Sequence, residues 1–238
     1  MTSLESWSVV AQNLPEHARN AIHTDAGAQA AGFPRALVAG VTTYAYLTHV
    51  PMAAWGLDWV RSGGGEVRFR RPVFDGDTVR CTPTDDGTLT VHAITDEPEQ
   101  PRAVLTVRRL GGAPVPMRDG ERLLDRSIPL DGEWGADYGA RAGDPLPLCG
   151  DAGVVHPAVW PALANHIVHT QVARGSWIHT RSIVRHHATA PAGAVADVSA
   201  TVVRRFEAHG ERAVLDVVIE VGGLLVATLE HEAIVALP

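Results

Sequence analysis

The chain has 238 residues, of which 45% are hydrophobic, and a formal net charge of −7 at pH 7. This length and composition predict a globular protein with one large domain or two small ones. The negative charge disfavours a nucleic-acid partner, and no apolar run approaches the roughly 20 residues of a membrane helix. The N-terminus lacks the basic and apolar regions of a signal peptide, which favours a cytoplasmic location.

The residue types that are missing exclude several kinds of chemistry. All 20 basic residues are arginine, so neither a Schiff-base lysine nor a P-loop is available. The cysteines, Cys81 and Cys149, form neither a disulfide framework nor a zinc pattern. His166 and His169 lack a carboxylate neighbour that would complete a metal site. No dinucleotide-binding, hydrolase or zinc-protease motif is present, so we expect no cofactor and no metal.

The first half predicts one long helix followed by an antiparallel meander. Residues 7–12 are expected to form an opening strand, and residues 25–31 a short helix. The long helix is expected over residues 37–55, where apolar residues recur with a helical period. Strand patterns separated by Asp-Gly turn signals follow at 66–69, 78–82, 89–94 and 103–110.

The second half repeats this order. Residues 111–150, rich in proline, glycine, aspartate and arginine, are expected to form an extended connection. A second helix is expected over residues 156–173, with strand patterns at 177–185, 194–206, 212–221 and 224–235. The repetition predicts two similar units, 1–110 and 151–238, that pack together and are joined by 111–150.

The start of the first long helix is the predicted ligand site. Ala39 and Gly40 are small and leave the first backbone N–H groups of the helix open. Such groups, at the positive end of the helix dipole, favour an anion or a polarised carbonyl. Asn20, His23 and Asp25 lie just upstream, and His23, which titrates near neutral pH, is expected to face this pocket.

Residues 20–40 begin N-A-I-H-T-D, end G-F-P-R-A-L-V-A-G, and resemble the hydratase-2 motif of the MaoC-like dehydratases. The segment F-R-R-P-V-F-D-G-D-T-V at 69–79 is similar to the strand and turn that follow the helix in that family. The resemblance implies a double hotdog fold of the α+β class, in which two sheets join edge to edge and each wraps its own helix. It also implies a lyase, an (R)-specific enoyl-thioester hydratase or 3-hydroxyacyl-thioester dehydratase, acting on coenzyme A or acyl carrier protein thioesters.

The motif departs from the family pattern at its acid. The family's aspartate lies five residues before its histidine, and Ala18 occupies that place here. The segment G-D-P-L-P-L-C at 143–149 resembles a second copy of the motif, with Asp144 at the acid position. The resemblance therefore implies His23 and Asp144 as catalytic residues. The expected substrate-binding residues are Asn20, Asp25, Gly40, as donor to the thioester oxygen, and His156.

Three functions stay open at this point. The first is a hydratase or dehydratase with a rearranged acid. The second is an isomerase or cyclase of a polyketide-like substrate, with His23 as the proton shuttle, and the third is a non-catalytic acyl-binding protein. In a structural alternative, His23 is a loop residue that hydrogen-bonds to the backbone, and Asp144 is a turn residue. Because two tandem copies supply the pairing that single-copy relatives gain by dimerising, a monomer and a homodimer are both compatible with the sequence.

Overall fold

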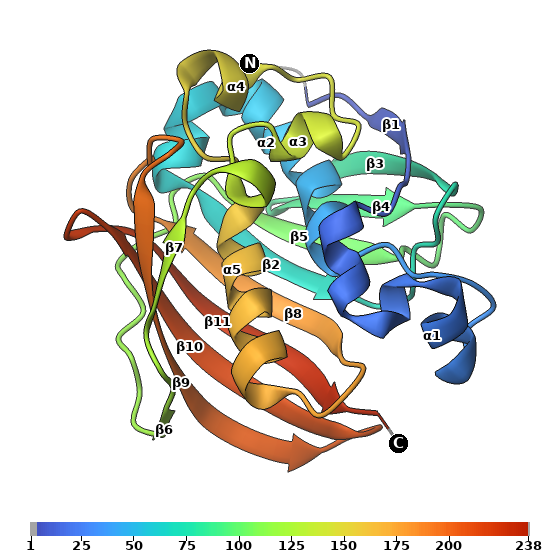
Figure 1. The fold of residues 1–238 in the computed structure, drawn as a ribbon. Helices are drawn as coiled ribbons and strands as arrows, with labels where there is room; N and C mark the ends of the chain where they lie inside the picture. The colour runs from blue at the N-terminus through green and yellow to red at the C-terminus, as the bar shows by residue number, and fades with distance from the viewer. Residues whose placement is uncertain (1–3, 238) are drawn as a thin grey trace.

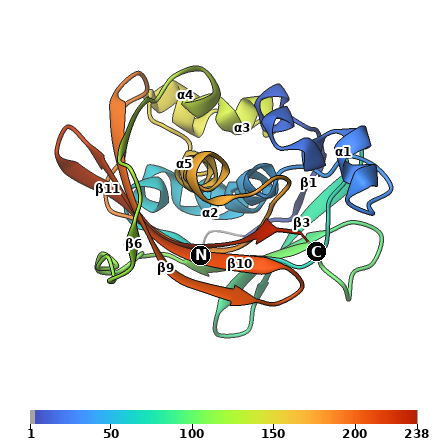
Figure 2. The ribbon, with the colours of Figure 1, turned by 60° about the horizontal axis from the view of Figure 1, so that its bottom comes forward.

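The structure is a computed structural model and describes residues 4–237. One large curved sheet wraps the two long helices, α2 (Gly40–Ser62) and α5 (Val159–Ile167), which lie side by side on its concave face (Figures 1 and 2). In spatial order the strands are β1 (Trp7–Val10), β3 (Thr78–Asp85), β4 (Leu89–Ile94), β5 (Ala103–Arg108), β2 (Gly64–Phe69), β8 (Ile178–His186), β11 (Leu224–Ala236), β10 (Glu211–Val221), β9 (Val195–Glu207) and β6 (Glu121–Arg122), and β7 (Arg126–Pro129) also pairs with β9. The predicted α+β order, a helix followed by an antiparallel meander in each half, is confirmed.

The first half contains part of the ligand site. In chain order its elements are β1 (Trp7–Val10), the 3-10 turns η1 (Pro15–Arg19) and η2 (Ala21–His23), α1 (Asp25–Ala30), α2 (Gly40–Ser62), β2 (Gly64–Phe69), β3 (Thr78–Asp85), β4 (Leu89–Ile94) and β5 (Ala103–Arg108). The short helix α1 is capped as its sequence predicts, because the Thr24 hydroxyl accepts the N–H of Gly27 at 3.2 Å.

The long helix starts and ends later than predicted. Leu37 forms a β-bridge with Phe74, so the backbone there is extended and α2 begins only at Gly40. At the other end the chain bends at Gly56, with a φ of 56°, and then continues for a last helical turn. This turn buries Trp59 completely in the core. The apolar pattern therefore located the helix but not its limits.

The second half repeats the helix and the meander, and the connection before it is more structured than expected. Its elements are α5 (Val159–Ile167), the π-helical turn η4 (Val168–Val172), β8 (Ile178–His186), β9 (Val195–Glu207), β10 (Glu211–Val221) and β11 (Leu224–Ala236). The connection includes β6 (Glu121–Arg122), β7 (Arg126–Pro129), η3 (Gly132–Trp134), α3 (Tyr138–Arg141) and α4 (Leu148–Ala152). Strands β6 and β7 pair with β9, and α3 and α4 cover the side of the long helices away from the sheet (Figure 2).

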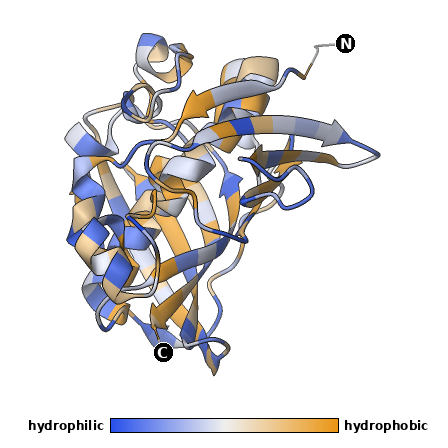
Figure 3. Ribbon diagram, turned by 90° about the vertical axis from the view of Figure 1, so that its right-hand side faces the viewer, coloured by the Kyte–Doolittle hydropathy of each residue, from blue (hydrophilic) through white to orange (hydrophobic). Residues whose placement is uncertain are grey.

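The core fills the space between the sheet and the two long helices. Hydrophobic residues run along the strands, whereas the loops carry many of the hydrophilic ones (Figure 3). The largest fully buried side chains include Tyr44, Tyr46, Trp59, Tyr138, Trp160 and Leu163. No helix within residues 4–237 is both long and apolar enough to cross a membrane.

The two halves join where β2 pairs with β8, and a glycine makes this joint close. Gly64 has a φ of 147°, and a Cβ there would lie 2.2 Å from the carbonyl oxygen of Val184. We expect Gly64→Ala to push β8 away and to lower the free energy of unfolding by roughly 1–3 kcal/mol. Chemical denaturation measures this loss. Gly150→Ala is the control, because a Cβ at Gly150 meets no atom within 4 Å; an equal effect of both substitutions would contradict the prediction.

Candidate active site

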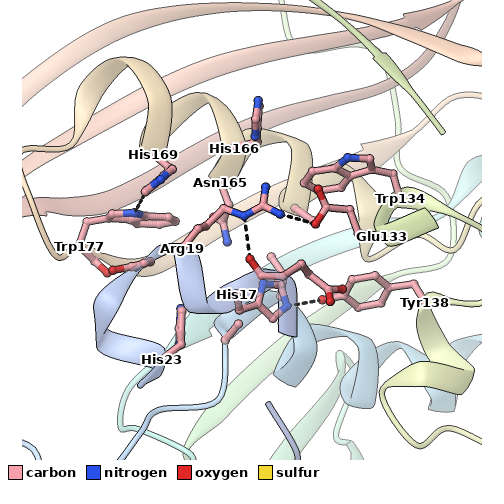
Figure 4. Close-up of a pocket in the computed structure, with 15 residues that line it drawn as sticks. His17, Arg19, His23, Glu133, Trp134, Tyr138, Asn165, His166, His169 and Trp177 are labelled. Atoms are coloured by element: carbon pink, nitrogen blue, oxygen red, sulfur yellow. Dashed lines mark hydrogen bonds and ion pairs between the residues drawn. The ribbon is translucent and has the colours of Figure 1, made fainter. Parts of the chain in front are cut away.

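A pocket of about 280 Å³ opens at the start of α2, between the two halves of the chain. Residues from η2, α2, β2 and β8 form its walls. The lining residues include Asn20, His23, Gly40, Phe69, Trp177 and His179. A smaller pocket of about 40 Å³ shares Asn20, His23, Asn165 and Trp177 with the larger one (Figure 4). His23 and Asn20 thus belong to the wall between the two pockets.

The first N–H groups of α2 are available to a ligand. Ala39 is the N-cap residue and provides no side-chain hydrogen bond. The first bonds to the Ala39 carbonyl oxygen come from the N–H groups of Thr42 and Thr43. Within residues 4–237, the N–H groups of Gly40 and Val41 have no acceptor. They lie at the positive end of a 23-residue helix, which favours a carbonyl oxygen that gains negative charge.

His23 offers a proton acceptor in this pocket. Its Nδ1 atom lies 2.8 Å from the carbonyl oxygen of Leu37. Because a carbonyl only accepts, Nδ1 carries the proton and Nε2 keeps a lone pair in the neutral ring. Burial lowers the pKa of His23 below its ordinary value, against the opposing effect of the bond to Leu37. The neutral form, with Nε2 as the base, therefore dominates at neutral pH.

Asn20 offers an acceptor in the same pocket. Its Nδ2 atom donates to the carbonyl oxygen of Trp177 at 2.9 Å, which links the η2 segment to the second half. Its Oδ1 atom is buried and has no partner among the described residues. A buried acceptor left unpaired is costly, so a ligand hydroxyl or a water molecule is the partner that suits Asn20.

His17 is a half-buried histidine that lines the smaller pocket, and no sequence pattern pointed to it. Its Nε2 atom lies 3.1 Å from the Tyr138 hydroxyl and 3.2 Å from the Thr42 hydroxyl, and its ring centroid lies 5.9 Å from that of His23 (Figure 4). Burial, with the nearby His23 as the next cause, lowers the pKa of His17 to about 3. The neutral ring joins η1 to α2 and α3. Its partners are remote in sequence, so no local pattern pointed to it.

The structure does not bring Asp144 to His23. The Asp144 carboxylate is buried, and its Oδ1 atom lies 2.7 Å from Nδ1 of His49, in the middle of α2. The same oxygen accepts the N–H of Leu146 at 2.8 Å, in the Asx-type turn of the structural alternative. Asp144 lines neither pocket, and its contacts hold the connection against α2.

Asp25 and His156 also lie outside both pockets. The exposed Asp25 accepts the N–H of Ala36 at 2.9 Å, which closes the loop before α2. The Nδ1 atom of His156 accepts the N–H of Ala158 at 3.1 Å, close to the start of α5. Of the predicted site residues, the pocket therefore brings together Asn20, His23 and Gly40.

Comparison with known proteins supports the fold. Residues 16–96 match the family described as the MaoC-like domain. A MaoC domain protein from Chloroflexus aurantiacus is 11% identical, with 98% of this chain and 95% of that chain covered and a TM-score of 0.62. A conserved hypothetical protein from Mycobacterium tuberculosis, described as a double hotdog fold, is 14% identical, with 98% and 96% covered and a TM-score of 0.65.

A Lactobacillus plantarum protein described as an oleoyl thioesterase is 9% identical, with 100% and 98% covered and a TM-score of 0.51. A search of curated proteins finds no match. At these identities the solved structures show the fold alone. The double hotdog fold that the sequence predicted is confirmed, and residues 16–96 of its first half are similar to the MaoC-like domain.

Proposed function

Because residues 16–96 of this double hotdog chain match the MaoC-like domain, we propose that the protein is an enzyme that catalyses the reversible addition of water to 2-enoyl thioesters. One observation carries the proposal. A neutral imidazole, His23, and the unbonded N–H of Gly40 at a helix start line the same pocket. This pair supplies a base and an oxyanion donor, which hydration of an enoyl thioester needs.

In this proposal the thioester oxygen accepts the Gly40 N–H, and Asn20 Oδ1 holds the attacking water. His23 Nε2 takes a proton from the water as the water oxygen bonds to C3 and the electrons of the double bond move to the thioester oxygen. The resulting enolate then takes that proton from His23 at C2. The product is a 3-hydroxyacyl thioester, and the reverse sequence releases water. The family resemblance favours the R enantiomer, which chiral chromatography of the product tests.

A second candidate is a double-bond isomerase, and the composition of the pocket favours it. No aspartate or glutamate of the described residues lines the larger pocket. A single base that removes a proton from one carbon and returns it to another needs no carboxylate partner. The cyclisation of a polyketide-like chain makes the same demand on His23.

The test is incubation of the protein with crotonyl-CoA. The loss of enoyl absorbance gives the rate, and mass spectrometry gives the mass of the product. We expect a product heavier by one water molecule, with no release of free thiol. The pocket volume is near the lower end of the roughly 300–1,000 Å³ typical of ligand sites, which favours a short acyl chain such as this one. Conversion of 3-butenoyl-CoA to crotonyl-CoA without hydration would favour the isomerase, and release of thiol alone would overturn the hydratase proposal.

Arginines at the pocket suit the phosphates of coenzyme A. Arg70 and Arg71 are exposed and line the larger pocket. We expect the double substitution Arg70→Glu, Arg71→Glu to raise KM for crotonyl-CoA about tenfold, since about 1.4 kcal/mol of lost attraction corresponds to that factor. The N-acetylcysteamine thioester, which lacks phosphates, is the control and should keep its KM. An equal rise for both substrates would contradict this role of the arginines.

A further inference from the structure

A buried chain of three side chains in the second half ends at the pocket. Nε2 of His179 lies 2.8 Å from the Ser182 hydroxyl oxygen, which lies 2.8 Å from Nδ1 of His231. The three residues are at most 5% exposed. Within residues 4–237, Nδ1 of His179 and Nε2 of His231 have no partner. The chain is therefore hydrogen-bonded internally and open at both ends.

The open nitrogen of His179 lies against the start of α2. A Cβ built on Gly40 would lie 3.4 Å from it, and His179 and Gly40 line the same pocket. The ring centroid of His179 lies 4.6 Å from that of Phe69, which packs beside it. An unpaired buried nitrogen is costly. A ligand atom next to the Gly40 N–H is the partner within its reach.

A β-bulge turns His179 toward the pocket. In a regular strand, residues three apart point to opposite faces of the sheet. Here β8 advances by two residues, from Arg181 to His179, where its partner β11 advances by one. The extra residue places His179 on the same inner face as Ser182.

The hydrogen bonds of this chain allow two arrangements of the neutral rings. In one, His179 Nε2–H donates to Ser182 and the Ser182 hydroxyl donates to His231, which leaves a lone pair on His179 Nδ1. In the other, every direction is reversed, and His179 carries a proton on Nδ1. A carbonyl in the pocket can only accept, so it stabilises the second arrangement. Burial, followed by the neighbouring His231, lowers the pKa of His179 well below its usual range, which keeps the ring neutral.

We propose that His179 is a second oxyanion donor, whose Nδ1–H bonds the thioester oxygen beside the N–H of Gly40. Ser182 and His231 are positioning residues that hold the required tautomer. This inference rests on the proposed function, because the acceptor is the thioester carbonyl. It requires no change of charge, since a neutral imidazole N–H donates to the oxygen throughout. The β-bulge of β8, in the second half, thereby places a hydrogen-bond donor in the pocket that His23 and Gly40 of the first half line.

The first test compares His179→Phe with His179→Asn. Phenylalanine keeps a ring without nitrogens, whereas the asparagine amide places a donor close to the position of Nδ1. We expect His179→Phe to lower kcat for crotonyl-CoA hydration by about 10²–10³-fold, as the loss of one oxyanion donor does elsewhere. His179→Asn should restore part of kcat. If His179→Phe keeps the full kcat, the inference is overturned.

The second test needs no turnover. Butyryl-CoA labelled with ¹³C at its carbonyl binds without reacting, and its C=O stretch reports polarisation. We expect a lower frequency on the wild-type protein than in water, and a smaller lowering on Ser182→Ala. In parallel, ¹⁵N NMR of the wild-type protein should show the proton of His179 on Nδ1 once butyryl-CoA is bound. An unprotonated Nδ1 in that complex, or no binding of butyryl-CoA, would overturn the inference even if His179→Phe fails to fold.

The two tests separate the inference from the proposed function. A wild-type protein that polarises butyryl-CoA through His179 but hydrates no enoyl thioester supports the inference, while the hydratase proposal fails. Hydration by the wild-type protein, unchanged in His179→Phe, supports the hydratase and removes His179 from it.

Discussion

Replacing His23 by asparagine is expected to lower kcat for the hydration of crotonyl-CoA by about 10²–10⁴-fold, the range typical of a general acid–base group. Asparagine keeps a side-chain N–H that can still donate to the Leu37 carbonyl oxygen, but it has no equivalent of Nε2. The substitution therefore removes the base and leaves the η2 segment held in place. Initial rates of enoyl loss, measured at saturating substrate, give kcat directly.

Two further variants distinguish chemistry from folding. His23→Ala removes both the base and the bond to Leu37, so it should lose as much activity and also some stability, by about 1 kcal/mol for one hydrogen bond. His92→Asn makes the same exchange on β4, where the ring contacts Thr90 and lines neither pocket. It should keep full activity. A wild-type rate in His23→Asn would remove His23 from the mechanism.

The fold follows from patterns that are local in sequence. Helical and alternating apolar periods, with glycines at the turns, were enough to predict a helix and a meander twice. The limits of α2 did not follow, because Leu37 makes a β-bridge and Gly56 bends the helix without ending it. The connection was also predicted too simply. Its short strands, β6 and β7, form by pairing with β9, and a pairing between segments so distant in sequence leaves no local pattern.

The candidate site, like the fold, could be predicted only in part from the sequence. Asn20, His23 and Gly40 lie within one short segment, and all three line the larger pocket. Asp144 was linked to this pocket by motif alone, and a long-range partner, His49, takes its carboxylate instead. The sequence did not predict the contact between His179 and Ser182, because strict alternation along β8 would place these two residues on opposite faces of the sheet. A single inserted residue reverses that direction, and neither propensity nor period locates such a bulge.

Acid is expected to unfold the protein because several histidines are buried in the neutral form. His156, His179, His186 and His231 are each at most 5% exposed. Burial lowers the pKa of His156 and His186 to about 4 and that of His231 to about 3, and it holds the pKa of His179 well below its ordinary value. In the unfolded chain these rings titrate near the ordinary value of 6.5. Below that pH the unfolded state therefore binds more protons than the folded state, and stability falls as the pH falls.

The expected loss is large compared with the stability of a domain. Each such histidine changes the free energy of unfolding by about 1.4 kcal/mol per pH unit between its two pKa values. Four together give roughly 5.6 kcal/mol per pH unit, against a total stability of about 5–15 kcal/mol. We expect the circular-dichroism signal of the folded state to disappear between about pH 6 and pH 4. Well above pH 6.5, where the rings are neutral in the unfolded chain as well, these residues should add no pH dependence.

Substitution of one buried histidine tests whether these rings cause the pH dependence of stability. The Nδ1 atom of His186 lies 3.1 Å from the carbonyl oxygen of Trp59, and an asparagine amide can donate to the same oxygen without titrating. His186→Asn should therefore reduce the slope of unfolding free energy against pH by about one proton, as measured by denaturant titrations at several pH values. His209→Asn, on the exposed turn before β10, is the matched control and should leave the slope unchanged. If the wild-type free energy differs by less than about 1 kcal/mol between pH 5 and pH 7, these rings are not held neutral by burial. The neutral His179 required for the second oxyanion donor would then lose its physical basis.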